Sequence, residues 1–331
     1  MAGKRATPAA MTRPPARTTS DRLVLSGVVV VDKPAGPTSH DIVDRVRQAL
    51  GERRVGHTGT LDPFATGVLP VCVGKATRLA QFLAAGEKAY RATARLGFAT
   101  TTDDATGEPL SAPRPVAVDR AQVEAAARTL VGEQMQVPPA YSAKRSGGER
   151  LYDLARRGVA VERPPVRVVV HALEVRRADG DAVEMEVRCG AGTYVRALAR
   201  DLGERLGTGA HLVALRRIRN GSFSERDAVT WDDVPVRGRD ALVPMAALLP
   251  DLPAVTVTDE GQRALRFGRD LAAPLLVGGF PSAAGPRWRV LDGSGALLAL
   301  ASPRGTAAEG ELRVDPVLHP DIVLLETAGG G

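Results

Sequence analysis

The chain has 331 residues, a net charge of +6, 44% hydrophobic residues and 25% charged residues. This composition is that of a globular protein with one large domain and an appendage, or two domains, and it excludes a disordered or fibrous chain. No apolar run is long enough to span a membrane as a helix. Two cysteines without a Cys-x-x-Cys pattern, and five scattered histidines, argue against a disulfide framework and a structural metal site, and fit a reducing cytoplasm.

The first 25 residues are predicted to form a disordered basic tail. They hold five Lys or Arg residues against one Asp and lack the apolar centre of a signal peptide. The positive charge of the whole chain favours a polyanionic partner such as nucleic acid, although a GC-rich coding bias, which enriches Arg, gives the same excess.

Strands and helices then alternate without a strict β-α-β order. "GVVVVDKP" (27–34) predicts a buried strand that Pro34 ends, and "SHDIVDRVRQALG" (39–51) predicts a helix with Ser39 as its N-cap. A strand and a helix are expected in 67–86, and the alternation of 87–100 predicts a further strand.

The second half of the main domain continues this mixture. A helix is expected in 119–132, and strands in 165–177 and 181–192 flank an Asp179-Gly180 turn. The apolar stripe Tyr194, Leu198, Leu202 and Leu206 predicts a helix in 193–207. The pattern favours an α+β fold with a mostly antiparallel sheet in 26–249. After Pro250 a hairpin with an Asp-Gly turn predicts a small β-rich second domain, 250–331.

One loop stands out chemically. "GHTGTLDPFATGVLP" (56–70) contains a single carboxylate, Asp62, among small neutral residues. Asp-Pro pairs readily start turns, so the ordinary interpretation is a turn. Small residues also let the backbone and a ligand approach closely.

The chain has only four tyrosines: Tyr90, Tyr141, Tyr152 and Tyr194. Each lies in a segment with Arg or Lys close by. Tyrosines next to basic residues suit stacking on bases and bonding to phosphates, so their shared setting points to RNA.

Four segments together resemble the bacterial tRNA pseudouridine synthase B family. They are the Asp62 loop, "KPAGPTSHD", "AYSAKRSGGERLYDLARRG" and "GTYVRALARDLGERLGTGAHLVALRR". The likeness covers about residues 27–249, and Phe64 and Thr101 depart from the usual Leu and Asp. The resemblance implies the pseudouridine synthase fold, with helices flanking the central sheet, a small PUA-like RNA-binding domain at the C-terminus, and isomerisation of uridine 55 in the tRNA T-loop.

The same resemblance implies roles for single residues. Asp62 is the catalytic carboxylate and Arg196 its partner. Tyr90 stacks on the extruded uracil and relays the proton lost from C5, Tyr194 packs in the same pocket, and His57 helps to hold the T-loop. Further candidate RNA contacts are Lys33, Lys144, Arg145 and Arg216.

The implied reaction breaks the C1′–N1 bond and joins C1′ to C5. Nothing is oxidised and nothing leaves, so no cofactor or metal is expected. The base must leave its stack to be reached. The implied partner is the T-arm of tRNA, and we expect a cytoplasmic monomer without an obligatory protein partner.

Three alternatives stay open at this point. The chain could modify another RNA, including by a guide-dependent route. It could bind or fold RNA without turnover. It could be an acid-dependent nuclease or glycosidase, although those enzymes usually need two carboxylates or metal ligands.

Overall fold

The structure is a computed structural model that describes residues 25–140, 145–146, 149–150, 163–280, 285–305 and 317–325. Residues 1–24 of the predicted tail, Tyr141, Lys144 and Tyr152 lie outside this part of the chain. So does the side chain of Arg145, whose backbone forms a short strand.

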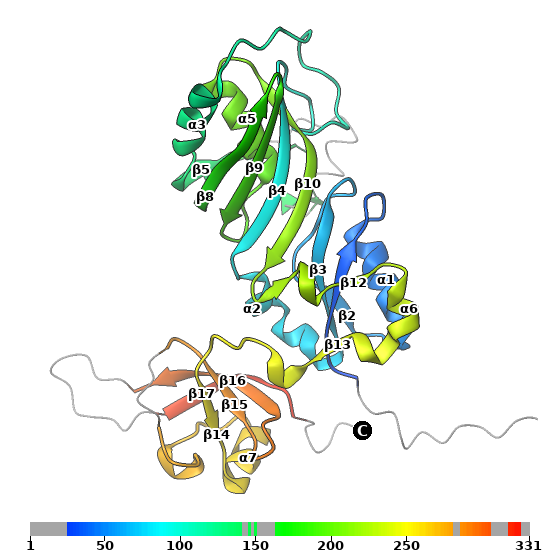
Figure 1. The fold of residues 1–331 in the computed structure, drawn as a ribbon. Helices are drawn as coiled ribbons and strands as arrows, with labels where there is room; N and C mark the ends of the chain where they lie inside the picture. The colour runs from blue at the N-terminus through cyan, green and yellow to red at the C-terminus, as the bar shows by residue number, and fades with distance from the viewer. Residues whose placement is uncertain are drawn as a thin grey trace, which may run out of the picture.

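An eleven-stranded sheet runs through the larger part of the molecule (Figure 1). Its main order is β12-β1-β3-β10-β4-β9-β8-β5, with β2, β11 and β13 paired at the side. The pairs β1–β12 and β3–β10 are parallel, and the other pairs are antiparallel, which confirms the predicted mixed, mostly antiparallel sheet. The strands are β1 Gly27–Lys33, β2 Val55–His57, β3 Thr66–Val73, β4 Lys88–Leu96, β5 Gly132–Gln136, β8 Val166–Asp179, β9 Ala182–Cys189, β10 Ala210–Asn220, β11 Phe223–Ser224, β12 Val229–Thr230 and β13 Leu242–Pro244.

Helices pack on both faces of this sheet. Those in 39–50, 120–128, 195–205 and 233–237 share a core with Val29 and Val31 on one face, and residues 76–83 share a core with Val28 and Val30 on the other. The helices are α1 Ser39–Leu50, η1 Gly74–Leu79, α2 Ala80–Ala84, α3 Arg120–Arg128, α5 Val195–Arg205, η2 Glu225–Asp227, α6 Asp233–Arg237, η3 Gly238–Ala241 and η4 Met245–Ala247. A separate two-stranded ladder joins β6 Arg145–Ser146 to β7 Glu149–Arg150. The helices of the described part are all too short or too polar to cross a membrane.

Strand β4 shows how the sequence fixes the two faces. Tyr90, Ala92 and Leu96 join the core under the helices, whereas Arg91 is exposed on the opposite face. Successive side chains of a strand point to opposite faces, so the alternation in the sequence sets the orientation of Tyr90. Helix α5 contributes Leu198 and Leu202, both fully buried, to the same core.

The predicted N-cap of α1 was wrong by one residue. Thr38 caps the helix, because its hydroxyl accepts from the Asp41 amide and the Asp41 carboxylate accepts from the Thr38 amide. This reciprocal pair is a capping box. The Ser39 hydroxyl is instead buried and bonds the Leu61 amide and carbonyl at 2.9 and 3.0 Å, next to Asp62.

The C-terminal part is a four-stranded sheet in the order β14-β15-β16-β17. Its elements are β14 Ala254–Thr256, α7 Asp259–Arg266, η5 Ala273–Leu275, β15 Trp288–Leu291, β16 Leu297–Arg304 and β17 Val317–Val323. The predicted hairpin is present as β15–β16, and the Asp292 carboxylate accepts from the amides of Ser294 and Ala296 in its turn. The boundary at residue 250 stays a prediction.

The two parts share one hydrophobic cluster. It joins Val28, Cys72 and Leu83 of the larger part to Leu300 and Leu324 of the C-terminal part. At the same junction the Arg287 guanidinium lies 4.5 Å from the Phe82 ring centroid. The C-terminal sheet therefore covers apolar surface that belongs to the β1–β3 region.

This shared cluster predicts a large effect of trimming Leu300. Because Leu300 has no exposed surface, Leu300→Ala should lower the free energy of unfolding by about 2–5 kcal/mol. Leu110→Ala is the matched control, since Leu110 is 65% exposed and should change stability little. Urea denaturation of both variants measures the difference. Equal stabilities of the two variants would show that the cluster is loosely packed.

Candidate active site

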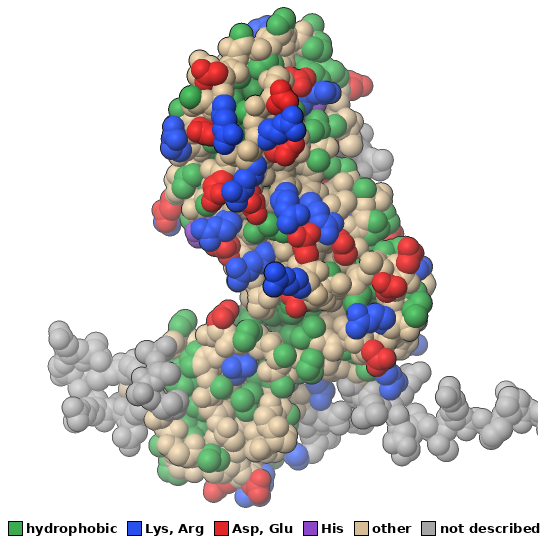
Figure 2. Space-filling model, in the orientation of Figure 1, with side chains coloured by type: hydrophobic (Ala, Val, Ile, Leu, Met, Phe, Trp, Pro, Cys, Tyr) green, Lys and Arg blue, Asp and Glu red, His purple; other side chains and the backbone are tan. Residues whose placement is uncertain are grey.

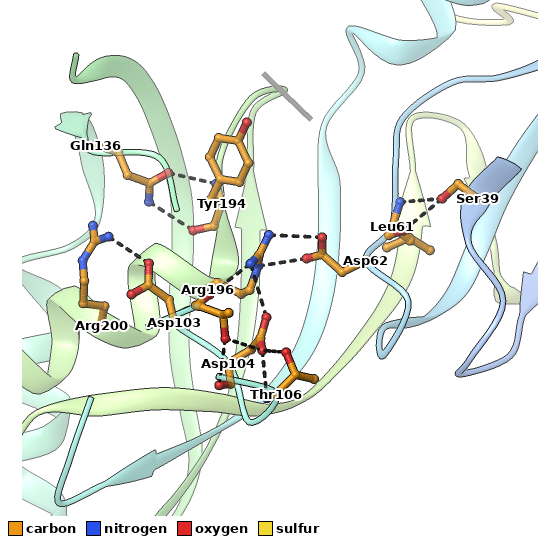
Figure 3. A network of polar contacts seen from close by, with 11 residues as sticks. Ser39, Leu61, Asp62, Asp103, Asp104, Thr106, Gln136, Tyr194, Arg196 and Arg200 are labelled. Carbon is orange, nitrogen blue, oxygen red and sulfur yellow. Dashed lines mark hydrogen bonds and ion pairs between the residues drawn. The ribbon is translucent and has the colours of Figure 1, made fainter. Parts of the chain in front are cut away.

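Asp62 and Arg196 form a two-pronged ion pair (Figure 3). The Arg196 Nε lies 2.9 Å from one Asp62 oxygen, and Nη2 donates to the other at 3.1 Å. The Arg196 side chain is only 4% exposed, whereas that of Asp62 is 32% exposed. A planar guanidinium that holds both carboxylate oxygens fixes the direction of the carboxylate.

The N-terminal end of α5 places Arg196. Tyr194 is the N-cap residue, and the fully buried Gln136 bonds both its amide and its carbonyl, at 2.9 and 3.1 Å. Gln136 ends strand β5, so a sheet strand anchors the start of the helix that carries Arg196. The sequence prediction missed Gln136, because its use depends on a partner 58 residues away.

Backbone contacts hold the Asp62 loop from the other side. The Asp62 carbonyl accepts from the Ala65 amide at 3.1 Å, so the expected Asp-Pro turn is present as well as the ion pair. The Lys33 ammonium donates to the carbonyls of Pro63 and Ala65 at 3.1 and 2.7 Å. With the bond from Ser39 to Leu61, these contacts leave the loop little freedom.

A second carboxylate, Asp104, also binds Arg196, and the sequence prediction missed it. Its Oδ2 accepts from Arg196 Nη1 at 3.2 Å, and its Oδ1 accepts from the hydroxyls of Thr102 and Thr106. Asp104 is 4% exposed. Arg196 therefore bridges two acids from distant loops, and only the cluster "TTTDDATG" in the sequence hinted at an ordered turn there.

Burial raises the pKa of the Asp62 carboxyl above its ordinary value. The Arg196 guanidinium opposes this shift in pKa, and the negative charge of Asp104 adds to it. A carboxyl that acts as a nucleophile or base needs to be ionised, so in that role a raised pKa of Asp62 would move the acidic limit of activity upward.

Asp104→Asn should move that limit down. Loss of the Asp104 charge lowers the pKa of Asp62, so the acid limb of the kcat–pH profile should shift to lower pH. The maximal rate should also fall, because Arg196 loses a buried partner. Asp179→Asn is the control, since that carboxylate is exposed and pairs with Arg177. An acid limb that shifts upward, or not at all, contradicts this account.

A cavity of about 260 Å³ opens beside the ion pair. Its lining includes the expected residues Asp62, Tyr90, Tyr194 and Arg196. The volume is slightly below that of pockets for drug-sized ligands, so the cavity suits a nucleoside-sized group. Burial raises the pKa of Tyr90, which keeps its hydroxyl protonated.

The remaining expected residues lie elsewhere. His57 ends β2 and accepts from the Gly59 amide at 3.2 Å, and burial lowers the pKa of its imidazole. Lys33 is 0% exposed and binds backbone carbonyls, so the structure argues against a direct contact with RNA phosphate. Arg216 binds Asp32 at 3.0 and 2.9 Å and also pairs with Glu225.

A larger hollow of about 520 Å³ lies on the outer face of the sheet, away from Tyr90. Its arginines Arg91, Arg176 and Arg216 all pair with carboxylates. Figure 2 shows charges of both signs intermixed over this face. The smaller cavity, which holds the Asp62–Arg196 pair, is therefore the better candidate for the active site. In the described ranges, no group of three or more His, Cys, Asp or Glu side chains is placed to hold a metal ion.

Two family matches cover most of the larger part of the chain. The TruB family pseudouridylate synthase (N terminal domain) matches residues 47–195, and the tRNA pseudouridylate synthase B C-terminal domain matches residues 196–242. The DKCLD (NUC011) domain matches residues 3–43.

Named relatives agree with these matches. "tRNA pseudouridine synthase B" of Solibacter usitatus is 40% identical over 305 residues, which are 91% of this chain and 100% of that protein. The protein of the same name from Thermobifida fusca is 54% identical over 63% of this chain and 74% of its own.

Solved structures show the same fold. A chain in an H/ACA RNP bound to a substrate RNA containing 2′-deoxyuridine has a TM-score of 0.70 at 27% identity, over 92% of this chain and 87% of that chain. A chain in a Cbf5-Nop10-Gar1 complex has a TM-score of 0.70 at 29% identity, over 92% of this chain and 86% of that chain.

Fold and matches define the class of protein as a pseudouridine synthase. More narrowly, the chain belongs to the TruB family of tRNA pseudouridine synthases, as the resemblance of its motifs predicted.

Proposed function

We propose that the protein isomerises uridine to pseudouridine in tRNA, at position 55 of the T-loop, with Asp62 as the catalytic carboxylate. One observation carries the proposal. Asp62 lines a nucleoside-sized cavity together with Tyr90 and Tyr194, and a two-pronged contact from Arg196 fixes the orientation of its carboxylate. The tRNA substrate follows the names of relatives 40–54% identical to this chain.

Each residue of the cavity has its own role in this reaction. Tyr90 stacks on the flipped uracil, and its hydroxyl, protonated because burial raises its pKa, passes on the proton released from C5. Asp62 attacks C6 of the base, attacks C1′, or removes the C2′ proton. Arg196 fixes the orientation of the Asp62 carboxylate in each of these three paths.

The wider contacts are proposals of the same kind. His57 and Tyr194 hold the T-loop around the flipped base, and Lys144 and Arg145 contact its backbone. Residues 250–331 act as a PUA-like RNA-binding domain that grips a more distant part of the RNA. The protein works in the cytoplasm as a monomer without an obligatory protein partner.

The decisive experiment incubates the full chain with an unmodified tRNA transcript and maps pseudouridine along it. Conversion at position 55 supports the proposal. Conversion only in another RNA would favour a different target, and binding without conversion would favour an RNA-folding protein. Strand breaks or free uracil would indicate a nuclease or glycosidase.

Tyr90→Phe tests the hydroxyl separately from the ring. The variant keeps the stacking surface, so its Kd for tRNA should stay close to native, while kcat should fall by about 10²–10⁴-fold because proton transfer is lost. Binding and single-turnover assays measure the two effects. Full activity of the variant would restrict Tyr90 to stacking.

A further inference from the structure

Two more cations line the catalytic cavity. Lys88 is 8% exposed and Arg217 is 1% exposed, and both belong to the cavity wall that holds Asp62 and Tyr90. Lys88 lies two residues before Tyr90 on β4, so both side chains point to the same face of the strand. Arg217 on β10 lies directly opposite Tyr90 in the strand register.

Both cations approach the backbone just before Asp62. A Cβ atom placed on Gly59 would lie 3.8 Å from Lys88 Cε and 3.8 Å from Arg217 Nη1. Arg217 Nη2 also donates to the Gly59 carbonyl at 3.1 Å. Lys88 and Arg217 thus form one patch, which we term the cationic floor of the cavity.

Within the described part of the chain, neither cation pairs with a carboxylate. Lys88 donates to the carbonyls of Ala84 and Gly86, at 2.7 and 3.0 Å, which uses two of its three N–H groups. Arg217 donates to the carbonyls of Val68 and Gly59. By contrast, Arg196 in the same cavity binds two acids.

Buried charges in proteins are normally paired, because removing an isolated charge from water is unfavourable. Burial and the neighbouring Arg217 lower the pKa of Lys88 to about 8, with Cys189 opposing. The positive charges of Lys88 and Arg217 therefore repel each other in the free protein. Negative charge that develops on a bound substrate beside them would relieve this cost.

We propose that Lys88 and Arg217 bind the carbonyl oxygens of the flipped uracil and stabilise the negative charge that the ring acquires during the reaction. This inference rests on the proposed function. When the C1′–N1 bond breaks, its electron pair stays on the uracil and spreads to O2 and O4. When C5 then bonds C1′, the C5 proton leaves and N1 gains a proton, so the overall change is an isomerisation.

The proposal does not depend on the path that Asp62 follows. Attack at C6 sends an electron pair to O4 as an enolate, whereas attack at C1′ or loss of the C2′ proton releases a uracil anion. In each path the carbonyl oxygens carry the charge. Fixed cations in a site that excludes water are a strong form of transition-state stabilisation.

The competing interpretation is structural. The carbonyls of Ala84 and Gly86 end helix α2 and the turn after it, and Lys88 could serve only to satisfy them. Lys88→Gln separates the two roles, because an amide has two N–H donors for these carbonyls and carries no charge.

The test is a double-mutant cycle between protein and RNA. T-arm RNAs carry 2-thiouridine, 4-thiouridine or uridine at the target, since sulfur accepts hydrogen bonds weakly. With uridine, Lys88→Gln should lower kcat by about a hundredfold while its Kd for the RNA changes little. One thio substitution should slow the native enzyme by about tenfold more than it slows the variant, which is the coupling expected of a direct contact.

Lys75→Gln is the matched control, because it removes one lysine charge outside the cavity lining and should show no coupling. Lys88→Met replaces Lys88→Gln should the latter fail to fold. Equal thio effects in native and variant proteins would overturn the proposal. A second outcome would also overturn it. If the effect of Lys88→Gln depended on an uncharged methylphosphonate beside the target uridine, and not on thio substitution of the base, the cationic floor would bind a phosphate. A native protein that forms no pseudouridine at all would instead refute the proposed function.

Discussion

Asp62→Asn is expected to lower pseudouridine formation by about 10⁴-fold or more, as the loss of a nucleophile or base does in other enzymes. A carboxamide can neither attack carbon nor take up a proton at neutral pH. The substitution keeps the shape of the side chain, so the loop bonds from Lys33 and Ser39 should persist. Affinity for tRNA should therefore stay close to native.

Single-turnover kinetics at saturating RNA, together with a binding assay, measure both quantities. Asp201→Asn is the matched control, since Asp201 is a poorly exposed carboxylate that pairs with Arg200 and lies outside the cavity lining. If the Asp62 variant keeps a tenth or more of the native rate while the control is unaffected, Asp62 is not the catalytic carboxylate.

Local patterns predicted most of the fold. The alternation in β4, the Asp-Gly turn between β8 and β9, and the apolar stripe of α5 each depend on residues close in sequence. Because one face of each element is buried, its periodicity is visible without the rest of the structure. The mostly antiparallel sheet followed from the lack of β-α-β alternation.

The errors arose where a long-range contact decides the use of a polar residue. Thr38 and Ser39 are both suitable N-caps, and the bond from Ser39 to Leu61, 22 residues away, decides between them. Lys33 was expected to contact RNA, but its three carbonyl partners lie in the turn after β1 and in the Asp62 loop. A charged residue at the end of a strand does not reveal whether it faces solvent or a neighbouring loop.

The candidate site was predicted only in part, because long-range contacts also decide which residues line it. Motif resemblance pointed to Asp62, Tyr90, Tyr194 and Arg196, and the structure brings these four to one cavity. Asp104, Lys88 and Arg217 were not selected, although Arg217 lies in one of the four segments that carried the resemblance. Arg216 and Arg217 are adjacent in sequence, yet one reaches the outer hollow and the other the cavity, because strand neighbours face opposite sides.

Arg196→Lys should be almost as inactive as Arg196→Ala, with kcat lowered by about a hundredfold or more, because small misplacements of a reacting group cost that much. The guanidinium holds both Asp62 oxygens, the Asp104 carboxylate and the Thr102 carbonyl at once. A lysine ammonium is a single point on a flexible stem and cannot reproduce this planar fork. Its charge would still compensate the two acids, so the Lys variant should be more stable than the Ala variant.

Kinetics and urea denaturation of both variants separate orientation from charge. In Arg196→Ala two acids face each other without a cation, and breaking such a buried pair costs about 3–5 kcal/mol of stability. Arg200→Lys is the matched control, since Arg200 lies one turn further along α5 and binds Asp103 and Asp201 but not Asp62. We expect Arg200→Lys to change kcat little. Near-native kcat of Arg196→Lys would show that Arg196 supplies only charge, and Asp62 would then owe its direction to the loop contacts of Lys33 and Ser39.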